Sequence, residues 1–234
     1  GGPADDHEGT RREDAAARVR QGMRAMLRLG SAWYDVAEQV KAITEDGLDP
    51  RNFILCTDDS HSGTLVQDGH MNRVVRHAIA QGLKRNVGLT SINLSSNKIT
   101  SSGGIKVASS LKANRSLRAV DLSRNFLGSN AASSIAAAVR RNDVLESLNL
   151  GHNRIGNGGA SALFSALETN DSMRALWLGH NKIGVVGSAG ITNMLNSNHG
   201  LRVLDLSDAK VSDKDVVRLV RLGNLTVLNL KHNR

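Results

Sequence analysis

The feature that most constrains the fold is an apolar pattern that recurs along residues 89–233 at a spacing of twenty-eight residues. Counting Leu89 as position 1, leucine or another aliphatic residue fills positions 1, 4, 6 and 11, and asparagine fills position 9. Further copies begin at Leu117, Leu145, Met173 and Leu201, and a sixth begins at Leu225 after twenty-four residues. One copy cannot bury its own apolar face, so copies of this length stack on one another as the coils of a solenoid.

A second apolar pattern runs in phase with the first. Apolar residues stand four positions apart in alanine-rich segments, as in Val107 and Leu111, Ile135 and Val139, Leu163 and Leu167, and Ile191 and Leu195. This spacing predicts helices with one buried face. Asparagine closes each segment, at Asn114, Asn142, Asn170 and Asn198. We expect it there because asparagine tolerates the left-handed conformation that is common at helix ends.

A short strand and a full helix within twenty-eight residues resemble the ribonuclease-inhibitor-like leucine-rich repeats, a class also found in NOD-like receptors. The resemblance implies an α/β fold over residues 77–234. This fold is a right-handed solenoid of five to six repeats, with parallel strands inside a horseshoe arc and helices outside.

Asparagine at position 9 is expected to be structural, because its amide can satisfy backbone groups where the chain leaves the sheet. The residues concerned are Asn97, Asn125, Asn153, Asn181 and Asn233. Ala209 replaces asparagine in the fifth copy and should weaken the solenoid locally. Leucines of the last copy would face an open edge, which predicts aggregation of the isolated chain or further sequence after Arg234.

The composition indicates the cellular compartment and limits the classes of partner. The single cysteine, Cys56, excludes internal disulfides and favours a reducing compartment, so we expect a cytoplasmic protein. No apolar run approaches the length of a membrane span, and no signal peptide is recognisable. Residues 84–234 carry 20 Lys and Arg against 9 Asp and Glu, which could serve an acidic partner or nucleic acid. Most of these charges fall near the helices, which favours a solvated outer face, and nucleic acid is not the expected partner.

Residues 1–76 lack the repeat and form a separate expected domain. Thr10 and Glu13 match a capping box and predict a helix over 10–30, and a second helix is expected over 31–40. The apolar run 53–56 predicts a strand of a parallel sheet that is buried on both faces. Polar residues at the carboxyl end of such a strand are where α/β barrels keep their catalytic groups.

This segment resembles a late part of the TIM barrel of bacterial-type adenine deaminases, in the amidohydrolase superfamily. The blocks that carry the resemblance are Asp6-His7-Glu8, Gly22-Met23, Gly30-Ser31, Thr57-Asp58-Asp59 with His61, Gly69-His70, Val74-Val75-Arg76 and Ala78-Ile79. Those enzymes convert adenine to hypoxanthine and ammonia with a metal-bound water as the nucleophile.

The resemblance implies site roles for three residues. His7 and Asp58 would bind a divalent iron, manganese or zinc ion, Asp58 would also move a proton, and Asp59 would lie near the substrate. The family's His-x-His metal pair and most of its strands are absent from this chain, and two ligands are too few for a catalytic metal. We therefore expect no deaminase activity from this chain alone, and otherwise no cofactor.

The repeats favour a non-catalytic function. In this class the residues between the leucines line a concave surface that faces a partner protein. The candidate partner-binding residues are Asp121, Arg124, Asn149, His152, Trp177, His180 and Asp205. Trp177 is the strongest candidate because interface hot spots favour Trp, Tyr and Arg, although it could instead pack against a neighbouring strand residue.

The two patterns overlap over 77–86, where Ile79, Leu83 and Asn86 stand twenty-eight residues before Val107, Leu111 and Asn114. A single helix could therefore end one pattern and begin the other. The junction is either a natural fusion or a chimera, and the sequence leaves both open. In either case, the first segment could cap the open end of the solenoid.

Overall fold

The computed structural model describes residues 5–6, 11–28, 36–49, 53–56, 82–84, 87–211 and 224–233. The chain forms two compact units, residues 1–86 and residues 87–234. The domain boundary expected after residue 76, and most of the helix expected to be shared over 77–86, lie outside the described residues. Only 82–84 of that helix are described, and they are helical.

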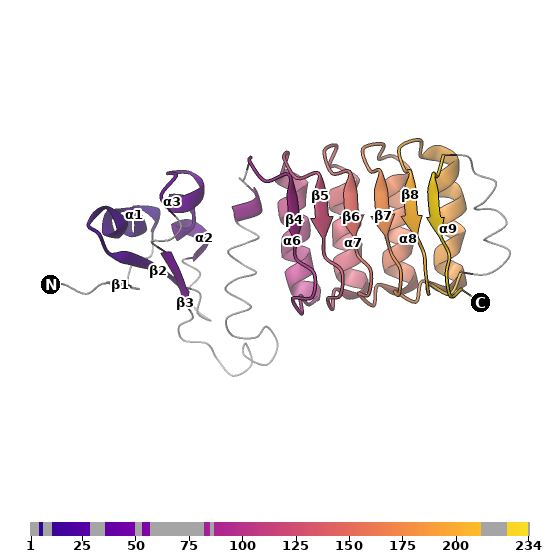
Figure 1. The fold of residues 1–234 in the computed structure, drawn as a ribbon, viewed down its shortest axis with the longest axis horizontal. Helices are drawn as coiled ribbons and strands as arrows, with labels where there is room; N and C mark the ends of the chain where they lie inside the picture. Colours follow the sequence, from indigo (N-terminus) through magenta and orange to yellow (C-terminus); the bar gives the residue numbers. More distant parts are fainter. Residues whose placement is uncertain are drawn as a thin grey trace. The chain divides into compact units, whose positions relative to one another are not determined.

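The second unit is built on one sheet of six parallel strands that follow one another in chain order, as Figure 1 shows. The strands are β4 (Ser91–Asn93), β5 (Ala119–Asp121), β6 (Ser147–Asn149), β7 (Ala175–Trp177), β8 (Val203–Asp205) and β9 (Val227–Asn229). Equivalent positions of successive copies pair in register, for example Leu148 with Leu176. The predicted solenoid of parallel strands is confirmed.

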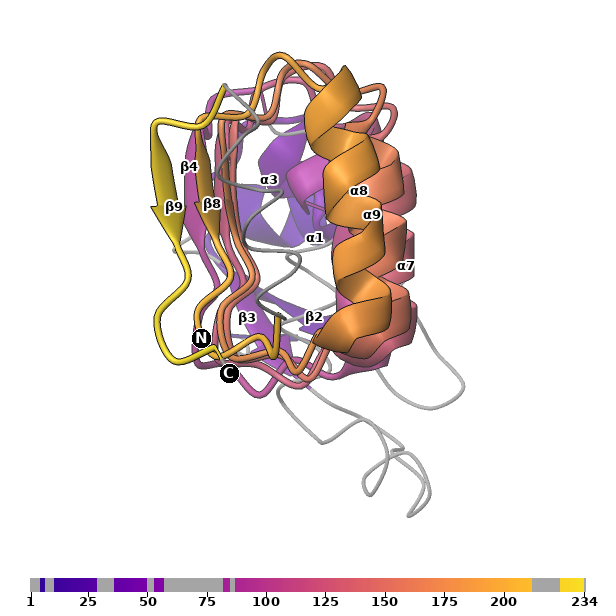
Figure 2. The ribbon, with the colours of Figure 1, turned by 90° about the vertical axis from the view of Figure 1, so that its right-hand side faces the viewer.

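Four helices in the described part of this unit form a second layer opposite the sheet (Figure 2). They are α6 (Ser101–Ala113), α7 (Gly128–Val139), α8 (Gly156–Leu167) and α9 (Gly184–Ser197). The paired apolar residues predicted to face inward, such as Ile135 and Val139, are buried, as are the aliphatic residues of the strands such as Leu148 and Leu176. Each fully buried leucine contributes about 1.5–3 kcal/mol relative to an exposed one, so the stacked layers hold the unit together.

The position-9 asparagines link the coils, as predicted. The side-chain amide of Asn153 donates to the backbone oxygen of Leu150 in its own coil, at 3.0 Å, and to that of Leu122 in the preceding coil, at 2.8 Å. Its backbone N–H donates to Oδ1 of Asn181 in the next coil, at 2.8 Å. Turn groups that would otherwise be buried without partners are satisfied in this way.

Ala209 breaks this ladder. Alanine offers no side-chain oxygen to the N–H groups of Asn181 and Ile183, whereas in the next coil Oδ1 of Asn233 accepts from the N–H groups of Ala209 and Val211, at 3.1 and 3.0 Å. The Ala209 side chain is buried. The loss of hydrogen bonds is therefore confined to the interface between the fourth and fifth coils.

The asparagines that close the helices act differently from the expectation. Asn114 has φ −71° and ψ 138°, and Asn198 has φ −85° and ψ 122°, so both are extended and the left-handed explanation is wrong. Oδ1 of Asn142 accepts from the N–H groups of Val144 and Leu145, and Nδ2 donates to the backbone oxygen of Leu111 in the preceding coil, at 2.7 Å. These residues form a second ladder, parallel to the first.

The first unit contains a three-stranded parallel sheet in the order β1-β2-β3. Its elements are β1 (Asp5–Asp6), α1 (Arg12–Arg20), β2 (Arg24–Arg28), α2 (Val36–Gln39), α3 (Lys41–Thr44) and β3 (Phe53–Cys56). A small core joins α1, β2 and α3 through Ala15, Ala16, Ala25 and Ala42. The strand predicted over 53–56 is confirmed, and the alternation of strand and helix is that of an α/β barrel segment.

The helix predicted over 10–30 is wrong in its second half. α1 ends at Arg20, Gly22 adopts a φ of 80°, and residues 24–28 form β2. A left-handed glycine ends the helix, and Ala25 and Leu27 then become buried in a strand. The capping residue also differs, because Arg11 donates its backbone N–H to Asp14 at 3.0 Å. Of the second helix, expected over 31–40, the described part is helical from Val36.

The leucines of the last copy are less buried than those of the copy before it. In the last copy, Leu225, Leu228 and Leu230 are half-buried, whereas Leu201, Leu204 and Leu206 of the preceding copy are buried.

Among the residues that the structure describes, no helix is both long and apolar enough to cross a bilayer.

Replacing Ala209 by asparagine should restore the broken ladder. The new side chain would accept from the N–H groups of Asn181 and Ile183, and we expect the free energy of unfolding to rise by about 1–2 kcal/mol. Urea denaturation followed by circular dichroism measures this change.

The matched variant is Asn153→Ala, which makes the same kind of gap in an intact part of the ladder. It should lower the free energy of unfolding by about 2–4 kcal/mol, because several buried polar groups lose their partners. A destabilised Ala209→Asn protein would show that this coil has no room for the amide.

Candidate functional site

The face of the sheet that points away from the helices carries the side chains of position 5 in a single row. Strand register places these residues opposite one another: Asn93, Asp121, Asn149, Trp177, Asp205 and Asn229. Neighbouring strands lie about 4.8 Å apart, so side chains in this position-5 row can contact one another. Four of the residues proposed from the sequence for partner binding, Asp121, Asn149, Trp177 and Asp205, are brought together here.

Most of the position-5 row serves the backbone. In five coils an Asn or Asp Oδ1 accepts the N–H of position 7, as Asp121 does from Ser123 at 2.8 Å and Asp205 does from Ser207 at 2.9 Å. The corresponding distances at Asn93, Asn149 and Asn229 are 2.9, 3.1 and 3.2 Å. This cap ends each strand, a role that the sequence interpretation missed although Asn or Asp recurs at position 5.

Trp177 is the exception in the position-5 row. The indole has one N–H donor and no acceptor, so it cannot cap the N–H of Gly179 as its counterparts cap their coils. A hydrogen bond of this kind contributes about 1 kcal/mol, which the fourth coil gives up. Trp177 is therefore the one departure from the capping pattern of this row.

A hollow of about 260 Å³ opens beside Trp177 over the first three strands. Small side chains form much of its floor, including Ser91, Ala119 and Ser147. Asp121 and Asn149 also line it, and Oδ2 of Asp121 accepts from Nδ2 of Asn149 at 3.3 Å. The arrangement can receive one inserted side chain on a floor of short side chains, with a carboxylate and an indole among the lining residues.

Position 8 forms a second row at the rim of this face. Arg124, His152, His180 and Asp208 all have positive φ, between 46° and 59°, and their backbone N–H groups each donate to the next coil. The imidazoles of His152 and His180 stack with centroids 4.0 Å apart and an interplanar angle of 13°. Nδ1 of His180 lies 2.9 Å from Oδ2 of Asp208. Arg124, His152 and His180 are thus brought together, as proposed from the sequence.

The stacked pair is poorly arranged for a metal. Nitrogen lone pairs lie in the ring planes, and nearly parallel rings do not direct them to one point. Among the described residues, no group of three or more His, Cys, Asp or Glu side chains could hold a metal ion. The pKa of His152 is lowered from its usual 6.5, first because burial disfavours the charged ring and then because His180 and Arg124 are close.

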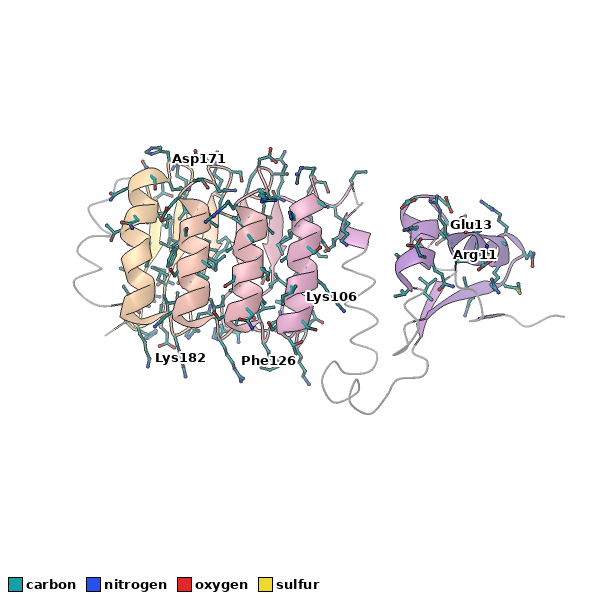
Figure 3. The ribbon with its side chains drawn as sticks, turned by 180° about the vertical axis from the view of Figure 1, so that it is seen from behind. Arg11, Glu13, Lys106, Phe126, Asp171 and Lys182 are labelled. Carbon is teal, nitrogen blue, oxygen red and sulfur yellow. The ribbon has the colours of Figure 1, made fainter. Side chains whose placement is uncertain are left out.

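A wider groove of about 600 Å³ crosses the opposite face, between α6, α7 and α8. It is lined mainly by alanine and serine at equivalent positions of successive coils, such as Ala108 and Ala136. Short side chains in a periodic helix layer produce such a groove, so it follows from the repeat itself. Seen from this side, Phe126 and Lys182 lie at one edge of the solenoid and Asp171 lies at the other (Figure 3).

The residues implied for deaminase chemistry, His7, Asp58 and Asp59, lie outside the described residues. The strands that precede them in the chain, β1 and β3, are both parallel neighbours of β2. The roles implied for these three residues stay predictions.

The lowered pKa of His152 predicts a pH-dependent stability. The unfolded chain binds the proton more tightly than the folded chain, so this contribution is complete above about pH 6.5 and is lost as the pH falls below it. Denaturation at pH 7.5 and pH 5.0 should show a smaller acid loss for His152→Asn than for the wild type. Asparagine suits the positive φ of this position.

His232→Asn is the matched control, because His232 occupies position 8 in the last copy and also has a positive φ, 60°. It lies outside the stacked pair. If both variants changed the pH dependence equally, the stacked pair would not be its source.

Comparison with known proteins agrees with the architecture of the second unit. A family model described as Leucine Rich repeat matches residues 86–108, 113–136, 141–164 and 197–220. Among solved structures, actin-binding site 2 of leiomodin-1 is 21% identical with a TM-score of 0.55, covering 61% of this chain and 84% of that one. The tropomodulin C-terminal domain of Caenorhabditis elegans is 12% identical with a TM-score of 0.56, covering 63% and 90%. These likenesses concern the fold.

A different group of proteins matches a shorter stretch. Adenine deaminase 3 of Rhizobium meliloti is 87% identical over 84 residues, which are 36% of this chain and 14% of the deaminase. The adenine deaminase of Mesorhizobium japonicum is 84% identical over 84 residues, with the same two coverages. This chain therefore spans about one seventh of the length of the curated relatives that it matches. The chain joins a segment similar to part of a bacterial adenine deaminase to a solenoid of leucine-rich repeats.

Proposed function

We propose that the repeats bind another protein through the concave face, with Trp177 as the anchor of the interface. The observation that carries this proposal is the substitution in the position-5 row, where Trp177 replaces an Asn or Asp that would cap the strand. Tryptophan is favoured at binding hot spots, and this chain has only two. The hollow beside Trp177 supplies the concavity into which a partner residue could insert.

The other candidate partner-binding residues fall into two groups, those that also cap a strand and those at the rim. Asp121, Asn149 and Asp205 already hold backbone N–H groups, so in this proposal they contribute their remaining lone pairs to the partner. Arg124, His152 and His180 form the polar rim around the anchor. We place this function in the cytoplasm, because a chain with one cysteine suits a reducing compartment.

Trp177→Asn tests the proposal without weakening the fold. Asparagine is the residue that caps three of the other coils, so the variant should be at least as stable as the wild type. Cross-linking capture from a lysate of the source cells, analysed by mass spectrometry, should lose the specific partner when Trp177 is replaced.

Lys112→Ala serves as the control, because Lys112 is exposed on α6 in the opposite layer. It should retain the partner. A protein that is captured equally by the wild type and by Trp177→Asn, yet lost with Lys112→Ala, would move the interface to the helices.

As a second candidate function, we propose that the first unit is an incomplete metal-dependent adenine deaminase, inactive alone. Its support is the identity of up to 87% with bacterial adenine deaminases. His7 and Asp58 would be metal ligands and Asp59 would lie near adenine. A catalytic metal of this kind needs about three protein ligands, so these residues do not complete a site and we derive no reaction step from them.

The purified chain should therefore release no ammonia from adenine, and it should retain no stoichiometric iron, manganese or zinc. An ammonia-release assay and elemental analysis measure both. Ammonia release that disappears in Asp58→Ala would show instead that the segment is an active enzyme.

A further inference from the structure

The size of the hollow beside Trp177 suits one amino-acid side chain. Sites for small molecules usually span roughly 300–1,000 Å³ and bury most of the ligand. The hollow, at about 260 Å³, is smaller and lies on an open sheet face. An inserted side chain from a protein partner fits these dimensions better than a free metabolite does.

The charge of the hollow selects the kind of side chain. Asp121 is the one charged residue among those that line it. Directly before strands β5 and β6, Arg118 forms an ion pair with Glu146, so these two charges largely cancel. Arg124 projects from the rim row, three positions further along the coil. The lining itself therefore favours a cation and disfavours a carboxylate.

Asp121 still has acceptor capacity for such a cation. A carboxylate offers about four lone-pair sites, and two of them receive the N–H of Ser123 and the amide of Asn149. Trp177 lies in the same row, one strand beyond Asn149, and its indole can attract a cation by its π face or cover the apolar stem of a long side chain. Lysine and arginine combine an apolar stem with a cationic end.

We propose that this hollow is a specificity pocket for one lysine or arginine side chain of the protein partner. The pocket rests on the proposed concave-face function and adds the chemistry of the residue that is recognised. Asp121 would receive the cation, Trp177 would flank the stem, and the short side chains of Ser91, Ala119 and Ser147 would leave the space for it.

Two substitutions, each with a matched control, separate the effect of charge from the effect of space. Asp121→Asn removes the charge and keeps an oxygen to cap Ser123, as Asn149 does in the next coil. Asp171→Asn is its matched control, since Oδ1 of Asp171 also accepts a backbone N–H, from His199 at 3.2 Å, and Asp171 does not line the hollow. Ala119→Val fills the floor, and Ala175→Val repeats that change outside the hollow, in a row where Val203 and Val227 already occur.

The experiment selects random heptapeptides displayed on phage against the full chain and keeps the clones that do not bind Trp177→Asn. Selected peptides should share a lysine or arginine. Their affinity, measured by fluorescence anisotropy, should fall about tenfold with Asp121→Asn, as expected for loss of a charge-assisted hydrogen bond. It should fall similarly with Ala119→Val and stay within about twofold with Asp171→Asn and Ala175→Val.

The outcomes distinguish the two proposals. Trp177-dependent peptides without a common basic residue, or peptides indifferent to Asp121→Asn, would overturn the cation pocket and leave the concave interface standing. Equal losses with Asp121→Asn and Asp171→Asn would also overturn it, because a general charge effect would then explain both. If no selected peptide depends on Trp177, the concave-face function itself fails.

Discussion

Hydrogen bonds from asparagine side chains to the backbone of adjacent coils are the interaction on which the solenoid depends. Each coil turns sharply out of the sheet and again at the end of its helix, and both turns bury backbone groups that water cannot reach. The ladder through Asn125, Asn153 and Asn181 satisfies the first turn, and the ladder through Asn142, Asn170 and Asn198 satisfies the second. With both turns fixed, the leucines can pack coil on coil, and the face of the sheet becomes a regular surface.

This regularity makes departures from the repeat informative. Ala209 and Trp177 each replace a residue that serves the backbone, but they differ in exposure. Ala209 is buried, so its consequence is a local loss of stability. Trp177 is half-buried on the strand face beside a hollow, where a side chain can contact a partner. The missing cap at an accessible position is the physical basis for the proposal that Trp177, rather than its neighbours, anchors a partner.

The features that depend on the repeat period could be predicted from the sequence. Spacing placed the six strands, the buried helix pairs and the asparagine ladder, because each follows from one unit that must stack. The prediction from spacing was wrong where the backbone conformation of one residue determines the secondary structure. Gly22 is the example, because its left-handed backbone divides a continuous apolar pattern into α1 and β2. The sequence interpretation also assigned Asp121, Asn149 and Asp205 to partner binding alone, since the cap to position 7 is visible only as a contact. The deaminase resemblance came from motif residues such as Asp58 and Asp59, which spacing alone could not have assigned.

The proposed role of Trp177 depends on the absence, in its coil, of the cap that Asn or Asp provides in the others. Amide hydrogen exchange at Gly179, followed by NMR, tests this most directly when the wild type is compared with Trp177→Asn under identical conditions. We predict slower exchange of the Gly179 N–H in the variant, because the new Oδ1 would accept it as Oδ1 of Asn149 accepts the N–H of Gly151. Equal exchange rates in the two proteins would contradict the account.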